Sequence, residues 1–154
     1  MNRVVLLGSK SFIASSIIKN IKKDKFKLLL IDRKICDFEK SSSVNILSKV
    51  LKTKDIIIFI AANAPVKDID MFNKNILICK NIYKSLDKIR DLHLIYISSD
   101  AVYSDSKKLI NENSKTEPDS LHGLMHLTRE RILYQLNTKK YTIIRPTLIY
   151  GPDD

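Results

Sequence analysis

Short apolar segments alternate with longer amphipathic segments along the whole chain. An uninterrupted apolar run is typical of a strand buried on both faces, whereas apolar residues three or four apart indicate a helix with one buried face. On this basis we predict strands at residues 4–7, 28–31, 35–38, 55–62, 92–97 and 141–145. We predict helices at residues 12–21, 41–51, 71–86 and 120–136.

The order of these elements predicts the fold class. Strands and helices alternate from end to end, with no internal repeat, low-complexity tract or Gly/Ser-rich linker. Such alternation predicts an α/β, Rossmann-type fold with a doubly wound, mostly parallel sheet and helices on both faces. A chain of 154 residues can bury a core of its own and fits one domain. We therefore predict a single domain over residues 1–154.

The first 32 residues are the unit around which the other elements are arranged. A strand ending at Gly8, a helix, and a second strand ending at Asp32 make a βαβ unit with an acid about twenty residues beyond the turn. This arrangement is typical of sites for the adenosine half of a dinucleotide. The turn departs from the Gly-x-x-Gly-x-x-Gly pattern, because Ser11 and Ala14 take the second and third glycine positions. A small-residue turn before an ordinary helix is the alternative explanation.

The helix that follows this turn is the predicted site for the pyrophosphate. Its first N–H groups have no partner within the helix, and the positive end of the helix dipole favours an anion. We expect the cofactor to meet Gly8, Ser11, Phe12, Ile13 and Ala14 at this point.

Asp32 favours NAD over NADP as the cofactor. Its carboxylate can accept hydrogen bonds from both ribose hydroxyls and would repel a 2′-phosphate. Arg33 beside it weakens this preference, because an arginine can pair with that phosphate. Asp37 is either a contact of the adenine amino group or an ordinary turn acid.

Small residues end the most apolar of the predicted strands. Ala61, Ala62 and Asn63 would let a ligand lie against the backbone at the carboxyl end of this strand, where open α/β sheets bind their ligands. On the following helix, Asn75 is either a water-holding site residue or an exposed helix residue.

Composition and charge argue against several other classes of protein. The net charge is +10, but the lysines are spread over the chain among isoleucines and asparagines, with no basic stripe. We attribute the charge to a lysine-rich composition and expect no nucleic-acid partner. No apolar run reaches membrane-spanning length, and the N-terminus does not resemble a signal peptide. Cys36 and Cys79 form no metal or redox spacing, which indicates a cytoplasmic protein.

The series of motifs resembles the extended short-chain dehydrogenase/reductase family, in its NAD-dependent epimerase/dehydratase branch acting on nucleotide sugars. The resemblance runs from Met1 to Asp154 and depends on the order of the motifs. The glycine turn, Asp32 and the Ala-Ala-Asn segment are followed by Ser98-Ser-Asp-Ala-Val-Tyr103, Glu117-Pro-Asp-Ser-Leu-His122-Gly-Leu-Met-His126, Glu130 and Arg145-Pro-Thr-Leu-Ile-Tyr150-Gly-Pro152. It implies NAD as cofactor and a nucleotide sugar as substrate.

The resemblance also implies three catalytic positions. In the family a Ser/Thr and a Tyr hold and deprotonate a sugar hydroxyl, and a Lys four residues after the Tyr binds the nicotinamide ribose. Ser99 falls at the Ser/Thr position, His122 at the Tyr position and His126 at the Lys position. Pro146 falls beside the nicotinamide.

The two histidines depart from the family pattern and leave two interpretations open. In the first, His122 is the acid/base, since its ordinary pKa of about 6.5 suits proton transfer at neutral pH, and His126 donates to the ribose. In the second, the protein binds the cofactor without turnover, as a sensor, a scaffold or a remnant of such an enzyme. No metal is expected, because no third ligand stands near the histidine pair.

Length is the second departure from the family. Its members continue past the Arg-Pro…Tyr-Gly-Pro motif into a C-terminal lobe that supplies most contacts to the sugar nucleotide, whereas these 154 residues stop at the motif. We therefore expect a truncated product, one that binds only the cofactor, or an assembly in which a homodimer or a second polypeptide supplies the substrate lobe.

Overall fold

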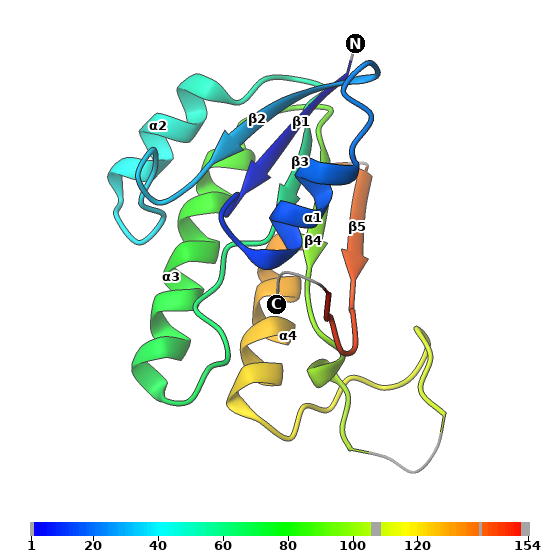
Figure 1. Ribbon diagram of the computed structural model, residues 1–154. Coiled ribbons are helices and arrows are strands. Elements are labelled where there is room, and N and C mark those ends of the chain that lie inside the picture. The colour runs from blue at the N-terminus through cyan, green and yellow to red at the C-terminus, as the bar shows by residue number, and fades with distance from the viewer. Residues whose placement is uncertain (1, 106–108, 139, 152–154) are drawn as a thin grey trace.

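A parallel sheet forms the centre of the protein (Figure 1). This computed structural model describes residues 2–105, 109–138 and 140–151. Within these ranges the sheet has the strand order β2-β1-β3-β4-β5, and every neighbouring pair is parallel. The strands are β1 (Asn2–Leu7), β2 (Phe26–Ile31), β3 (Ile56–Phe59), β4 (His93–Ile97) and β5 (Lys140–Ile144). The helices are α1 (Phe12–Asn20), α2 (Ser42–Val50), α3 (Ile69–Leu86), the short 3₁₀ helix η1 (Asp100–Val102) and α4 (Leu121–Leu133).

Helices cover both faces of the sheet. Side chains alternate in direction along a strand, so Val5 and Leu7 of β1 point to one face and Val4 and Leu6 point to the other. The first face carries the larger core, beneath α2, α3 and α4. The second face is covered by α1, whose Ala14 is buried against the sheet.

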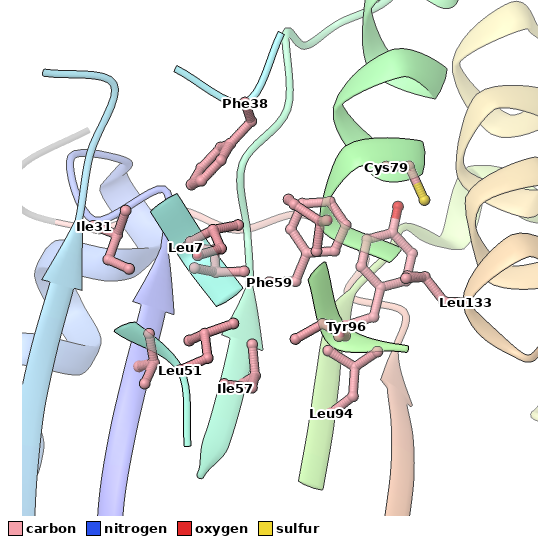
Figure 2. Close-up of a cluster of buried hydrophobic side chains, with 14 of the residues drawn as sticks. Leu7, Ile31, Phe38, Leu51, Ile57, Phe59, Cys79, Leu94, Tyr96 and Leu133 are labelled. Carbon is pink, nitrogen blue, oxygen red and sulfur yellow. The ribbon is translucent and has the colours of Figure 1, made fainter. Parts of the chain in front are cut away.

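The larger core joins the strands to the helices (Figure 2). Figure 2 shows Phe59 and Tyr96, from neighbouring strands, beside Cys79 of α3 and Leu133 of α4. The two aromatic rings lie 5.3 Å apart between centroids. This packing fixes the helix layer at the end of the sheet where the strands finish.

The predicted architecture is confirmed. All four predicted helices are present, and so are the strands predicted at 4–7, 28–31, 55–62, 92–97 and 141–145, with shifts at their ends. β3 is shorter than predicted because the N–H groups of Ile60 and Ala61 both turn to the carbonyl of Leu7. Among the described residues, no helix is long and apolar enough to cross a membrane.

The strand predicted at 35–38 is wrong, because the chain makes a turn there. The side chain of Asp32 accepts the N–H of Lys34 at 2.8 Å and the N–H of Ile35 at 3.1 Å. These local bonds curl the backbone away from the extended form that a strand needs. Ile35, the first residue of this predicted strand, is 59% exposed.

The winding of the chain reverses between β1 and β3. The connection through α1 leads from β1 outward to β2. The connection through α3 leads from β3 to β4, which is the opposite direction across the sheet. Ligands of open α/β sheets bind at the carboxyl ends of the strands at such a reversal. We call the space between the turn after β1 (8–11) and the segment after β3 (60–63) the crevice.

Candidate functional site

The turn after β1 fits against β3 because residue 8 is glycine. Gly8 has a φ of +99°, a conformation that favours glycine. A Cβ at this position would lie 2.7 Å from the backbone nitrogen of Ala61, closer than non-bonded atoms approach. The N–H groups of Gly8 and Ser9 donate to the carbonyl of Ile31 at the end of β2. The turn is therefore fixed to both neighbours of β1.

The start of α1 presents unpaired N–H groups. Ser11 is the N-cap residue, and its Oγ accepts the N–H of Ala14 at 3.2 Å. The N–H groups of Phe12 and Ile13 have no acceptor among the hydrogen bonds of the described residues. Together with the positive end of the helix dipole, they form a site suited to an anion.

A cavity of about 250 Å³ lies in the crevice, at the carboxyl ends of the strands. Most of the predicted cofactor residues line it, namely Gly8, Ser11, Asp32, Arg33, Asp37, Ala61, Ala62 and Asn63. Lys10 and Glu39 also line the cavity, and neither was predicted as a site residue from the sequence. The position of Lys10 within the glycine turn was the signal that could have identified it.

Asp32 is held in place by its neighbours on both sides. Its Oδ2 lies 3.3 Å from Nζ of Lys10, and its Oδ1 accepts the two N–H groups of the turn that follows β2. The hydrogen bond from the N–H of Ile35, with those from Lys10 and Lys34, holds the pKa of Asp32 below its ordinary value. The carboxylate is therefore ionised and already oriented at the cavity wall.

Arg33 pairs with two other acids of the same turn. Its Nε lies 3.7 Å from Oδ1 of Asp37, and its Nη2 lies 3.2 Å from Oε1 of Glu39. Oδ1 of Asp37 also accepts the N–H of Glu39 at 3.1 Å, which is the arrangement of a turn acid. Because Arg33 is exposed, these ion pairs are weak and the side chain is free to turn toward a ligand.

Asn75 positions the wall of the cavity from α3. Its Oδ1 accepts the N–H of Asn63 and its Nδ2 donates to the carbonyl of Asn63, both at 2.9 Å. The side chain is 0% exposed, so the interpretation of Asn75 as an exposed helix residue is wrong. The side chain of Asn63 in turn donates to Glu39 at 3.3 Å. One buried amide therefore fixes both backbone groups of a residue that lines the cavity.

Ser99 follows β4 and already has hydrogen-bond partners. Its Oγ accepts the N–H of Ala101 at 3.1 Å and donates to Oδ1 of Asp100 at 3.2 Å. Pro146 lies beside this segment, because its carbonyl accepts the N–H of Asp100 at 3.0 Å. Ser99 and Pro146 therefore share one end of the sheet, on the side of β4 and β5.

Gly123 lets the start of α4 pack closely against η1, beside the end of β4. A Cβ on Gly123 would lie 1.8 Å from the carbonyl oxygen of Ala101, so a side chain there would push α4 away from η1. This close contact places His122 near the carboxyl end of β4. No hydrogen bond joins His122 to Ser99 in the part of the chain that the structure describes.

His122 and His126 lie in different environments. His122 is half-buried, and its Nδ1 accepts the N–H of Val66 at 3.4 Å. His126 is 5% exposed, and its Nδ1 lies 2.8 Å from the hydroxyl of Tyr96. The two imidazole rings meet edge-on, with 4.7 Å between their centroids. The histidine pair therefore runs from the protein surface toward the sheet core.

Stability is expected to fall by about 2 kcal/mol between pH 7 and pH 5 because His126 is held neutral. Burial, with smaller contributions from Arg129 and His122, lowers the pKa of His126 to about 3. The unfolded chain takes up this proton near pH 6.5, so stability present at pH 7 is lost as the pH falls. The free energy of unfolding in urea, measured at both pH values, checks this expectation.

His126→Asn provides the control for this pH dependence. The amide keeps a polar group toward Tyr96 and removes the titrating ring, so its stability is expected to vary less between pH 7 and pH 5. An unchanged pH dependence in this variant would assign the effect to other groups.

A buried polar network lies behind the predicted catalytic residues. Glu130 of α4 accepts two hydrogen bonds from the guanidinium of Arg145, at 3.0 and 2.7 Å, and one from Ser98 Oγ at 2.6 Å. Arg145 also donates to the hydroxyl of Tyr103 at 2.6 Å. The hydrogen bonds to Glu130 hold the pKa of Arg145 above its ordinary value. This network ties α4 to the ends of β4 and β5.

Arg129 is a buried charge that was not predicted from the sequence. Its Nη2 donates to the carbonyl of Ala61 at 2.7 Å, and its guanidinium carbon lies 4.4 Å from the ring centre of Phe59 and 5.3 Å from that of Tyr96. Arg129 therefore connects α4 to the wall of the cavity. Its only signal in the sequence is its spacing from buried positions of the same helix, such as Leu133.

Comparison with known proteins identifies similar sequences and folds. The family described as the RmlD substrate binding domain matches residues 1–154. A dTDP-4-dehydrorhamnose reductase from Clostridium acetobutylicum superposes with a TM-score of 0.83 and 23% identity, over 97% of this chain and 54% of the reductase. The same enzyme from Bacillus anthracis, solved with NADP, gives 0.81 and 21%, over 99% and 56%. A UDP-glucuronic acid 4-epimerase from Bacillus cereus, solved with NAD, gives 0.79 and 21%, over 99% and 58%.

These solved structures are longer than the chain. It spans about half the length of the reductases that it matches. At such identities the superpositions show the fold alone, which is the predicted Rossmann-type α/β fold. No curated protein sequence matches the chain.

Proposed function

The chain belongs to the RmlD substrate binding domain family, and on this basis we propose that residues 1–154 are a NAD(P)-binding Rossmann domain with its cofactor in the crevice. Family membership agrees with the resemblance to extended short-chain dehydrogenase/reductases. The observation that carries the proposal is that Asp32 lines the same cavity as the turn after β1. Directly after this turn, the N–H groups of Phe12 and Ile13 have no acceptor among the described residues. One crevice thus offers a carboxylate for a ribose and N–H donors for a pyrophosphate.

The proposed contacts lie at the cavity and at the start of α1 beside it. The N–H groups of Phe12 and Ile13 would bind the pyrophosphate, and Asp32 would accept hydrogen bonds from the adenosine ribose. Asp37 also lines the cavity and would meet the adenine amino group. The cofactor would lie against the backbone of residues 61–63, which Asn75 and Arg129 hold in place.

NAD is the proposed cofactor, with NADP bound less tightly. An ionised Asp32 repels a 2′-phosphate, and its lowered pKa keeps it ionised. Lys10 and Arg33 reduce this repulsion, since both are exposed bases beside the carboxylate. The similar folds include one solved with NADP and one solved with NAD, so the fold accommodates either cofactor in those proteins.

Asp32→Asn is expected to abolish most of the preference for NAD. The unmodified chain should bind NAD at least about tenfold more tightly than NADP, and the variant should bind the two within about threefold, because the repelling charge is gone. Calorimetric titration of both proteins with both cofactors measures this difference.

Asp24→Asn provides a matched control, because it removes the same charge from an exposed position at the opposite edge of the sheet. It is expected to leave both affinities unchanged. Equal affinities of the unmodified chain for NAD and NADP would refute the role of Asp32, and no binding of either cofactor would refute the proposed function.

The proposed reaction is hydride transfer on a nucleotide sugar, with Ser99 and His122 at the sugar hydroxyl. His122 would act as acid/base, since its half-buried ring lies at the carboxyl end of β4. With Nδ1 of His126 bound to Tyr96, its Nε2 is the nitrogen that would donate to the nicotinamide ribose. Pro146 would flank the nicotinamide. Bound cofactor supplies the hydride acceptor, and these residues hold the sugar hydroxyl and move its proton.

A second polypeptide, or a second copy of the chain, is proposed to complete the substrate site. Leu148 and Tyr150 follow β5, and both side chains are largely exposed. β5 is an edge strand of the described sheet, and its Ile144 is also exposed. Apolar side chains in this position support a covering partner near the proposed nicotinamide end.

Cofactor binding without turnover is the second candidate function. It is favoured by the hydroxyl of Ser99, which is occupied as the cap of η1 and makes no described contact with His122. A sensor or scaffold would need the crevice but not the histidines.

A further inference from the structure

Lysines from separate parts of the sequence gather at the edge of the sheet opposite the crevice. In a parallel sheet, every connection from a helix to the next strand reaches the edge where the strands begin. This edge is uppermost in Figure 1. The connections before β2, β3 and β4 carry exposed lysines there, a set that we call the basic edge: Lys22, Lys23, Lys25, Lys52, Lys54 and Lys88.

Acidic side chains neutralise the basic edge only in part. Asp55 is buried and is bound by Arg3, with 2.6 Å between Nη2 and Oδ2, so its charge is used within the fold. The other acids of these three connections are Asp24, Asp87 and Asp91. Within the described ranges, no lysine of the basic edge forms a salt bridge.

Helix stability explains other basic residues but not the basic edge. Lys19, Lys49 and Lys84 lie in the last turns of α1, α2 and α3, where a cation stabilises the negative end of the helix dipole. The lysines of the basic edge lie beyond these turns, in the connections themselves. The helix dipoles therefore do not account for their position.

Backbone hydrogen bonds hold two of these connections together. The N–H of Lys54 donates to the carbonyl of Asp91 at 3.0 Å, and the N–H of His93 donates to the carbonyl of Asp55 at 3.0 Å. Neighbouring strands lie about 4.8 Å apart, so the connections before β2 and β4 are separated by about 15 Å. The lysines are thus presented across a preformed strip rather than on one mobile loop.

We propose that the basic edge docks the protein on a membrane surface containing anionic phospholipids. Lysines at one level on several connections fit a planar layer of phosphate groups, and each lysine near such a surface adds to the affinity. The three connections contain no aromatic residue and one arginine, Arg90, whereas nucleic-acid sites use aromatic stacking and arginine forks. The crevice at the opposite edge stays open to its ligand.

Vesicle binding by the 154-residue chain tests this docking. The protein is expected to sediment with phosphatidylcholine vesicles that contain phosphatidylglycerol, but not with phosphatidylcholine alone, and to dissociate as salt is added. K22Q/K23Q/K25Q is expected to weaken this binding by about a hundredfold. The matched control K67Q/K74Q/K80Q removes the same charge from exposed positions outside the basic edge, and is expected to change binding by less than about threefold.

Three outcomes would overturn the proposal. The first is no binding to phosphatidylglycerol vesicles, and the second is equal weakening by the two triple variants, which would show a response to net charge alone. The third is tighter binding to a DNA or RNA duplex than to vesicles, lost in K22Q/K23Q/K25Q, which would assign the surface to nucleic acid. All six substituted lysines are exposed, so circular dichroism and the thermal midpoint are expected to be unchanged in both variants.

Discussion

Replacement of Glu130 by alanine is expected to destabilise the protein by about 3 kcal/mol. Glu130 is 3% exposed and pairs with Arg145, whose side chain is 21% exposed, so the substitution leaves a half-buried guanidinium without its counter-ion. It also leaves the buried hydroxyl of Ser98 without its acceptor. The free energy of unfolding, from urea denaturation followed by circular dichroism, measures the loss.

Two further variants show whether the loss of stability comes from the broken network or from the lost charge alone. Glu130→Gln keeps the shape of the side chain and one acceptor oxygen, so its loss is expected to be intermediate. Glu117→Ala removes the partner of Lys115 from an exposed ion pair, and is expected to change stability by less than about 0.5 kcal/mol. A loss below about 1 kcal/mol for Glu130→Ala would contradict the importance of the network for the position of α4.

Replacement of His122 by alanine is expected to lower the rate of hydride transfer by about 10²–10⁴-fold. The proposed acid/base is removed, whereas the crevice around Asp32 is untouched, so the affinity for NAD should change by less than about threefold. The absorbance of the reduced nicotinamide, followed with a nucleotide-linked sugar present, measures the rate. Calorimetry measures the affinity.

His93 provides the matched control for this substitution. It lies at the start of β4, where its Nε2 is 2.8 Å from Thr142 Oγ1, and so it is at the opposite end of the strand from Ser99. His93→Ala is expected to leave the rate unchanged. NAD binding without any turnover by the unmodified chain would contradict the role of His122 and support the sensor or scaffold.

Element type could be predicted because apolar residues dominate the strands that form the sheet. The run that includes β3 has no polar residue between Ile56 and Ala62, and only a sheet covered on both faces buries such a run. The segment 35–38 shows where this reasoning fails. Its apolar residues suggest a strand, but the hydrogen bonds made by Asp32 turn the backbone first.

The lining of the crevice was predictable because its residues are fixed by local rules. Gly8, Ser11 and Asp32 follow directly from the end of a strand or the start of a helix, so topology alone brings them to one cavity. Lys10 reaches Asp32 for the same reason, although only the structure shows their contact.

The remaining features depend on contacts between distant residues. The hydrogen bond between His126 and Tyr96 joins a helix to a strand, and only the structure shows it. Asn75 and Arg129 act on the segment after β3 from two different helices. The basic edge is hidden for a similar reason, because its lysines are spread along the chain and meet only when the strands pair.

Amide NMR spectra of the ¹⁵N-labelled chain, recorded during titration with NAD, test the proposed binding in the crevice most directly. Binding there predicts saturable shifts for the N–H groups of Phe12 and Ile13 and for the turn after Asp32, with the signals of Lys22 and Lys52 unchanged. No saturable shift, or shifts confined to residues away from the crevice, would contradict it.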